Sequence, residues 1–236
     1  MRPDTPATTP ATTPATTPVE LVVLDMAGTT VADDGLVEEA FAAALPDHTP
    51  AAVAHVRATM GESKITVFRH LCGGDEDRAR AANRAFEAAY ARLVDEGRCA
   101  ALPGAEDTLR ALRAQGRTTA LTTGFSHDTQ SRILRALGWT DAADLVLCPS
   151  DAGGRGRPHP DMVLTAALRA RVGSVAAVAV VGDTASDIHS GRRAGASVVA
   201  GVRTGAHDAT VLRAAGATHV LDGVADLPGL LAAREG

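Results

Sequence analysis

The first strongly apolar stretch of the chain, residues 19–24, is short and ends at a charged residue, Asp25. Its length and its Val and Leu content are typical of a buried strand. From Leu36 onward, apolar residues recur every three to four positions, which is the spacing of one face of a helix. This helical pattern continues to about residue 97, with breaks near 46–50 and at 73–74. The pattern therefore predicts one strand followed by several helices.

Beyond Pro103 and Gly104, short apolar runs alternate with helical patterns. We expect helices at about 105–115, 127–137, 160–171 and 185–194, strands at 117–122, 144–148, 177–182 and 197–202, and then two weaker strand–helix steps. Strands that alternate with helices form a parallel sheet with helices on both faces. The predicted fold class is therefore α/β, a doubly wound parallel sheet with an inserted α-helical cap domain.

The same pattern divides the chain into three parts. Residues 1–18 repeat the tetrapeptide ATTP and carry almost no apolar surface, so we expect a disordered Thr/Pro tail. Residues 19–33 and 101–236 would form the α/β core, and residues 34–100 the helical cap. Ligands of such sheets bind beyond the carboxyl ends of the strands, where a cap would exclude water.

Composition and charge exclude several classes of function. The net charge is −5, and the aromatic residues are only four Phe, one Tyr and one Trp, which argues against a nucleic-acid surface. No apolar run reaches the ~20 residues that span a bilayer, and no basic stretch precedes an apolar one at the N-terminus. The cysteines, Cys72, Cys99 and Cys148, lack metal-ligand spacing. We therefore expect a cytoplasmic protein that binds neither nucleic acid nor membranes.

Three carboxylates follow predicted strands that would be neighbours in the sheet: Asp25, Asp183 and Asp187. A single residue of this kind is usually a helix cap or a turn former. Three carboxylates at adjacent strand ends would repel one another unless a cation joined them. Mg²⁺ prefers such oxygen ligands, and a substrate phosphate completes its coordination. The pattern therefore predicts a magnesium site for a phosphorus-containing ligand.

Four short motifs, at residues 25–30, at Thr123, at Arg157 and at residues 182–187, resemble in this order those of the haloacid-dehalogenase superfamily of hydrolases. Residues 25–30, Asp-Met-Ala-Gly-Thr-Thr, resemble its D-x-x-G-T motif, and Thr123 resembles the Thr or Ser that ends the next strand. Arg157 takes the place of the basic third motif, and residues 182–187 match the acidic G-D-x-x-x-D. The resemblance spans about residues 19–222 and implies that superfamily's Rossmann-like core.

The resemblance implies a role for each matching residue. Asp25 would be the nucleophile that forms an aspartyl-phosphate. Thr123 and the Gly124 amide would hold a phosphoryl oxygen, and Arg157 would neutralise charge on the nucleophile and the phosphoryl group. The implied cofactor is Mg²⁺, held by Asp25, the Ala27 carbonyl, Asp183 and Asp187.

Position 27 departs from most phosphatases of this superfamily, which carry a second Asp there as the general acid for the leaving oxygen. Ala27 cannot donate a proton. The D-x-A-G-T-T variant resembles the phosphonoacetaldehyde hydrolase branch, as do Arg157 and the G-D-T-x-S-D pattern at 182–187. Residues 60–64, Met-Gly-Glu-Ser-Lys, resemble the M-G-x-x-K of that branch, whose lysine forms a Schiff base. The resemblance thus places Gly61 and Lys64 at the substrate.

The pair Ala27 and Lys64 suits cleavage of a carbon–phosphorus bond. Such a bond leaves no oxygen to protonate, but it needs an electron sink on the neighbouring carbon. An imine between Lys64 and an aldehyde would supply that sink, whereas an arginine has no nucleophilic amine at physiological pH. Lys64 is the single lysine among the 23 Lys and Arg residues. The leading prediction is hydrolysis of phosphonoacetaldehyde to acetaldehyde and phosphate.

Other interpretations stay open. Lys64 is also interpretable as an exposed helix lysine or as a cation that binds substrate. Val67 stands where phosphonatases have a histidine, and Phe125 where they have a tyrosine. The alternatives are a phosphatase for a small phosphorylated metabolite and a non-catalytic metabolite-binding protein, and a homodimer is left open. Seven histidines without a pairing pattern are interpreted as surface or loop residues: His48, His55, His127, His159, His189, His207 and His219.

Overall fold

A six-stranded, all-parallel sheet forms the centre of the molecule, with the strand order β3-β2-β1-β4-β5-β6. The computed structural model describes residues 17–45 and 48–235, so most of the tail predicted at 1–18 lies outside the described residues. The strands are β1 (Leu21–Asp25), β2 (Thr118–Thr122), β3 (Leu145–Leu147), β4 (Val178–Gly182), β5 (Val198–Val202) and β6 (His219–Leu221). β1 lies between β2 and β4, with Leu24 opposite Leu121 and Val181. The predicted fold class is confirmed.

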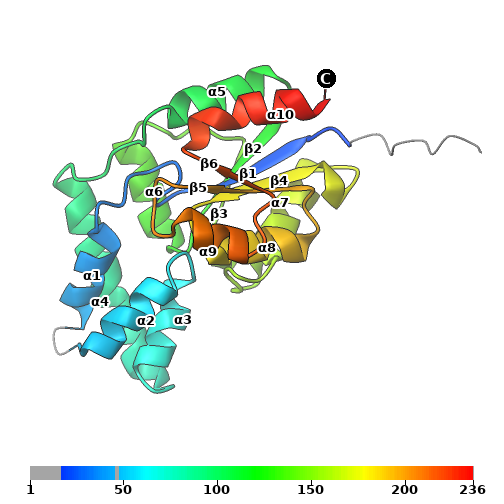
Figure 1. Cartoon of the computed structure of the whole chain (residues 1–236). Coiled ribbons are helices and arrows are strands. Elements are labelled where there is room, and N and C mark those ends of the chain that lie inside the picture. The colour runs from blue at the N-terminus through cyan, green and yellow to red at the C-terminus, as the bar shows by residue number, and fades with distance from the viewer. Residues whose placement is uncertain (1–16, 46–47, 236) are drawn as a thin grey trace, which may run out of the picture.

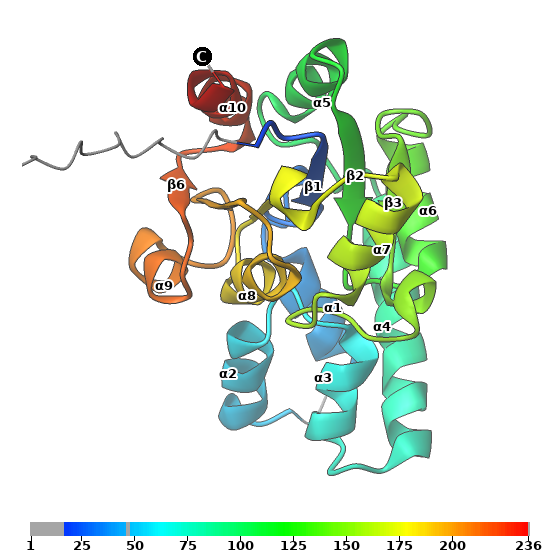
Figure 2. The same ribbon diagram turned by 90° about the vertical axis from the view of Figure 1, so that its right-hand side faces the viewer.

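Helices cover both faces of the sheet, as Figures 1 and 2 show. Successive side chains of a strand point to opposite faces, so Val22 and Leu24 pack on one side and Leu21 and Val23 on the other. The first side is covered by α5 (Ala105–Ala114), α6 (His127–Ala136) and α10 (Leu227–Glu235). The second is covered by α7 (Asp161–Ala170), α8 (Ala185–Ala194) and α9 (Ala209–Ala214). Two buried faces explain why the strands are apolar throughout rather than alternating.

The C-terminal segment differs from the prediction of two strand–helix steps after residue 202. β5 is followed by α9, and only one further strand–helix step, β6 and α10, completes the described chain. Residues 203–207 form turns and bends, because this stretch has polar and glycine residues and no apolar run. The prediction of a second extra strand was therefore wrong.

Four helices stand beside the sheet as a separate group, seen at the lower left of Figure 1. They are α1 (Leu36–Ala44), α2 (Pro50–Ala58), α3 (Lys64–Leu71) and α4 (Glu76–Asp95). Aromatic side chains join α1, α3 and α4: the ring centroids of Phe41 and Phe68 are 4.7 Å apart, and Phe86 of α4 lies 4.7 Å from Phe41. Tyr90 of α4 continues this cluster to Phe125 of the core at 4.5 Å. The helical group is thereby packed onto the end of the sheet that carries the motifs.

No helix in the described part of the chain has both the length and the apolar character that crossing a membrane requires.

Candidate active site

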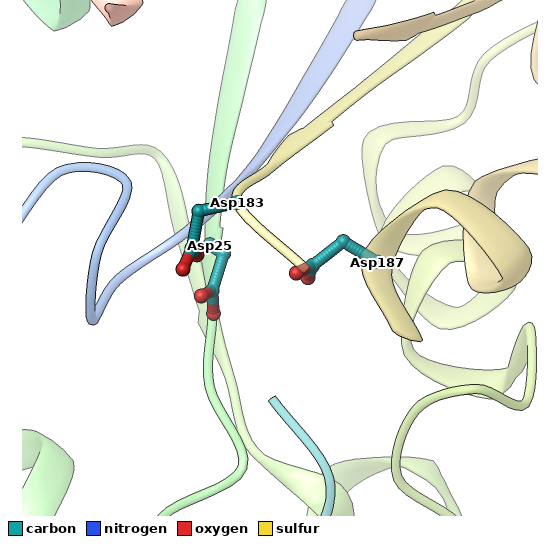
Figure 3. Close-up of side chains that lie close together, drawn as sticks. All are labelled: Asp25, Asp183 and Asp187. Atoms are coloured by element: carbon teal, nitrogen blue, oxygen red, sulfur yellow. The ribbon is translucent and has the colours of Figure 1, made fainter. Parts of the chain in front are cut away.

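The three predicted carboxylates meet at the carboxyl end of the sheet (Figure 3). Asp25 is the last residue of β1, Asp183 follows β4, and Asp187 lies in the first turn of α8. Because β1 and β4 are neighbouring parallel strands, their ends bring Asp25 and Asp183 to the same edge. Each residue offers one carboxylate oxygen, and these oxygens lie within 4.8 Å of one another. All three side chains are buried.

Arg157 provides positive charge between two of these carboxylates. Its guanidinium lies 2.5 Å from Asp25 and also binds Asp187. The side chain is buried, and its Nε–H has no hydrogen-bond partner among the described residues. A buried donor without a partner is costly, so this N–H is suited to an oxygen of a bound anionic group.

The remaining electrostatics favour a cation at the carboxylates. Burial raises the pKa of Asp25 well above its usual value, Arg157 opposes this shift, and Asp187 and Asp183 add to it. Burial and the neighbouring Asp187 also raise the pKa of Asp183, to about 6. A divalent cation would offset both the burial and the mutual repulsion. The buried oxygen donors therefore fit a hard ion such as Mg²⁺.

Hydrogen bonds fix the two acidic residues of the fourth motif. Thr29 donates its hydroxyl to Asp183 at 2.9 Å, and the Ala206 N–H donates to the other oxygen of that carboxylate at 2.8 Å. Asp187 accepts hydrogen bonds from the Thr184 hydroxyl at 2.5 Å and from the Thr184 N–H at 3.1 Å. Asp187 is thus part of the capping box of α8, whose N-cap is Thr184, and it also belongs to the carboxylate cluster. The helix-cap interpretation and the cluster are therefore both correct for this residue.

Gly28 shows why the first motif needs a glycine. Its φ is +83°, a left-handed conformation that side chains rarely adopt. A Cβ at this position would overlap the Asp183 carboxylate. The glycine therefore lets the loop after β1 pass directly over the acidic cluster.

The segment before α3 rests directly on the loops that carry the core motifs. Gly61 has a φ of +82°, and a Cβ there would come within 2.6 Å of the Thr184 hydroxyl. A Cβ on Gly124 would overlap the carbonyl oxygen of Glu62. The Lys64 N–H donates to the Gly124 carbonyl at 3.3 Å. These close approaches fix the start of α3, and with it Lys64, against the core.

Lys64 is buried at this junction, with only 6% of the residue exposed. Its Nζ lies 5.1 Å from the ring centroid of Phe125. Burial lowers the pKa of the Lys64 ammonium group, the Asp33 carboxylate opposes the shift, and Arg157 adds to it. The interpretation as an exposed helix lysine is therefore wrong. A lowered pKa increases the neutral fraction of the amine, which is the nucleophilic form.

One cavity of about 650 Å³ joins the core motifs to the helical group. Its wall contains every predicted site residue except Asp187: Asp25, Ala27, Gly61, Lys64, Thr123, Gly124, Arg157 and Asp183. Asp187 instead contacts Arg157 and Thr184. Residues of the predicted core and residues of the predicted cap therefore line one cavity, which is large enough for a small metabolite.

Comparison with known proteins decides the family. A family model described as haloacid dehalogenase-like hydrolase matches residues 19–195. The chain belongs to the haloacid dehalogenase-like hydrolase family. Within this family it is 30% identical over 215 residues to "Probable phosphatase IndB" of Dickeya dadantii, which aligns 89% of this chain and 92% of that protein.

Phosphonoacetaldehyde hydrolases are similar to the chain as well. It is 29% identical over 258 residues to the phosphonoacetaldehyde hydrolase of Salmonella typhimurium, covering 91% of this chain and 94% of that protein. The crystal structure of a phosphonoacetaldehyde hydrolase-like protein from Oleispira antarctica superposes with a TM-score of 0.82 at 25% identity, over 97% of each chain. The prediction of a haloacid-dehalogenase-type hydrolase is confirmed. Which bond this hydrolase cleaves must be argued from its own residues.

Several cavity residues of this hydrolase escaped the sequence analysis. Asp33 follows the first motif and lines the cavity near Lys64. His207 is a loop residue as interpreted, but it also lines the cavity, and its Nδ1 accepts the Ala185 N–H at 2.9 Å. The acidic pair at 33–34 was a usable signal, whereas no local pattern marks the loop at 204–207.

Proposed function

We propose that this hydrolase cleaves the carbon–phosphorus bond of a small carbonyl phosphonate, with phosphonoacetaldehyde as the lead substrate. The products would be acetaldehyde and phosphate. The observation that carries this proposal is the burial of Lys64, the chain's single lysine, in the cavity that Asp25 lines. At the same time Ala27 offers no proton to a leaving oxygen.

The proposed reaction begins at Lys64. Its neutral amine condenses with the aldehyde, releases water and forms a protonated imine. Asp25 then attacks phosphorus, and the electron pair of the breaking C–P bond moves into the imine to give an enamine. Splitting the transfer through an aspartyl-phosphate on Asp25 lowers each barrier. Protonation and hydrolysis of the enamine release acetaldehyde and restore the lysine. Water then hydrolyses the aspartyl-phosphate, which releases phosphate and restores the Asp25 carboxylate.

The surrounding residues stabilise charge on the phosphorus centre. Thr123, the Gly124 N–H and the Nε–H of Arg157, which has no partner among the described residues, would bind phosphonate oxygens from the cavity wall. Mg²⁺ would be held by Asp25, the Ala27 carbonyl, Asp183 and Asp187, where it would supply positive charge against the transferring group.

A second candidate function is hydrolysis of a small phosphate ester. Two observations favour it: the similarity to "Probable phosphatase IndB", and a buried, apolar Val67 where phosphonatases have a histidine. In that reaction Lys64 would act only as a charge that binds the substrate, and an arginine would serve as well.

Phosphate release separates the two functions. Wild type and Lys64→Arg are assayed with phosphonoacetaldehyde and with a panel of small phosphate esters, with and without Mg²⁺. The proposal expects phosphonate cleavage by wild type and its loss by at least about 10³-fold in Lys64→Arg, because the imine cannot form. Efficient ester hydrolysis that survives in Lys64→Arg, without cleavage of the phosphonate, would establish the phosphatase function instead.

A further inference from the structure

Imine formation at Lys64 requires proton carriers that the sequence pattern does not supply. The amine must lose protons and the carbonyl oxygen must gain them before water can leave. Val67, one helical turn beyond the lysine, is buried and apolar and cannot take part. If the proposed function holds, and the following inference rests on it, another side chain of the cavity must move these protons.

Most titratable groups that line the cavity are already engaged. Asp25 and Asp183 belong to the acidic cluster. Glu38 accepts hydrogen bonds from Arg57 at 2.8 and 2.9 Å, and the Arg57 guanidinium lowers the pKa of its carboxyl. His207 uses its Nδ1 lone pair to accept a backbone N–H, so it cannot accept a proton there. Asp33 and the exposed Asp34 are the acids left on the described cavity wall.

Asp33 is held in a fixed position with one oxygen free. Its Oδ1 accepts the Val37 N–H at 3.0 Å, and its carbonyl accepts the Leu36 N–H at 2.6 Å, at the beginning of α1. No hydrogen bond to Oδ2 is present among the described residues. Oδ1 thus holds the Asp33 side chain in place, and Oδ2 is free to accept a proton.

The charge of Asp33 is also coupled to that of Lys64. Burial raises the pKa of the Asp33 carboxyl, which brings it closer to the range in which a group both accepts and donates protons. Burial has the largest effect on the pKa of Lys64 and lowers it. Among the neighbouring charged groups, the Asp33 carboxylate has the largest effect and raises it. Asp33 and Lys64 also line the same cavity, so a proton can pass between them through one intervening water molecule.

We propose that Asp33 is the proton-transfer residue for imine formation at Lys64. The Asp33 carboxylate takes a proton from the Lys64 ammonium group. The freed amine bonds to the carbonyl carbon, and the π electrons move to oxygen, which takes the proton from Asp33. Asp33 then takes a second proton from the attached nitrogen and returns it to the hydroxyl group. Water leaves as the nitrogen lone pair forms C=N⁺, and Asp33 ends as the carboxylate with which it began.

A purely structural role for Asp33 makes a different prediction. Two residues before the N-cap of α1, its side chain contributes one acceptor oxygen to the Val37 N–H, which the amide oxygen of Asn also provides. As a negative charge it holds the Lys64 amine protonated, so its neutralisation would raise the reactive fraction of the amine. A role as hydrogen-bond acceptor or as charge alone therefore predicts that Asp33→Asn forms the imine at the wild-type rate or faster. Proton transfer predicts that it forms the imine more slowly.

The test is the rate at which borohydride and phosphonoacetaldehyde modify Lys64. We expect modification of wild type, and a rate in Asp33→Asn that is lower by about 10²-fold or more, the usual contribution of a general acid–base group. Asp34→Asn is the matched control, since it removes the same charge from the neighbouring residue, and it should stay within about twofold of wild type. Thermal unfolding of each variant checks the fold, and Asp33→Ser, which also lacks the carboxylate but keeps a side-chain hydroxyl as acceptor, replaces Asp33→Asn if that variant is unstable.

The outcomes are distinguishable. Modified wild type with Asp33 variants that react as fast or faster overturns the role of Asp33 and leaves the proposed function standing. An equal loss in Asp34→Asn assigns the effect to charge on the cavity rim and also overturns it. Wild type that is never modified at Lys64 overturns the proposed function and the role of Asp33 together.

Discussion

Replacing Gly61 with alanine should disable the enzyme by moving Lys64 rather than by removing a reacting group. The backbone at Gly61 has a φ of +82°, where a side chain costs about 1–2 kcal/mol. The new Cβ would also lie 2.6 Å from the Thr184 hydroxyl. That hydroxyl cannot easily move away, because it donates to Asp187 at 2.5 Å. The segment that carries Lys64, three residues further on, must therefore shift away from the core.

Gly74 provides a matched control within the same helical group. Its φ is +84°, but apart from its chain neighbours no atom of the described residues lies within 4 Å of where its Cβ would be. Both Gly61→Ala and Gly74→Ala should lower the melting temperature by about 2–8 °C, which corresponds to about 1–2 kcal/mol in a protein of this size. A misplacement of about 1 Å at a reacting group costs about 10²-fold in rate. We expect this loss of kcat/KM in Gly61→Ala and almost none in Gly74→Ala.

The assay is steady-state phosphate release from the substrate that wild type prefers, with differential scanning calorimetry of all three proteins. If the two variants are equally destabilised and equally active, the contact between Gly61 and Thr184 does not position Lys64 for the proposed reaction. The close approach of this segment to the core would then have no part in building the site.

Three further outcomes are expected. Asp25→Asn should lower phosphate release by at least about 10³-fold with an unchanged circular dichroism spectrum, and activity near wild type would remove Asp25 as the nucleophile. Mg²⁺ affinity, measured by titration calorimetry, should fall as the pH drops through about 6, where Asp183 gains a proton, and Asp183→Ala should bind the ion weakly at every pH. Ala27→Asp should raise phosphate-ester hydrolysis without raising cleavage of phosphonoacetaldehyde, since only an oxygen leaving group needs a proton; equal gains on both substrates would contradict the proposed roles.

The parts of the site that follow strands could be predicted from the sequence. One apolar run stops at Asp25 and another stops just before Asp183, so each carboxylate follows a predicted strand. The carboxyl ends of parallel strands lie at one edge of the sheet, which places both carboxylates there. The strands begin and end within one or two residues of the predicted positions. The prediction for the segment after β5 was wrong by one strand: α9 follows β5, and β6 is the single strand that remains in the described chain.

The meeting of the helical group with the core could not be derived from periodicity. Lys64 was singled out by its residue type and by a resemblance, but its burial depends on contacts between Gly61 and Thr184 and between Gly124 and Glu62. Such contacts join segments far apart in the sequence, and no local spacing records them. The same is true of His207, which a loop after β5 brings to the cavity.

The most direct test of C–P bond cleavage through an imine on Lys64 is the identity of the group that borohydride fixes on this residue. Each protein is treated with phosphonoacetaldehyde and borohydride, digested, and analysed by mass spectrometry of the peptide that contains the chain's single lysine. The imine mechanism predicts an ethyl group on Lys64 in wild type, where the C–P bond has been cleaved, and a phosphonoethyl group in Asp25→Asn, where the imine forms but phosphorus is not attacked. Phosphate released from phosphonoacetaldehyde by a wild-type enzyme whose Lys64 stays unmodified would contradict it.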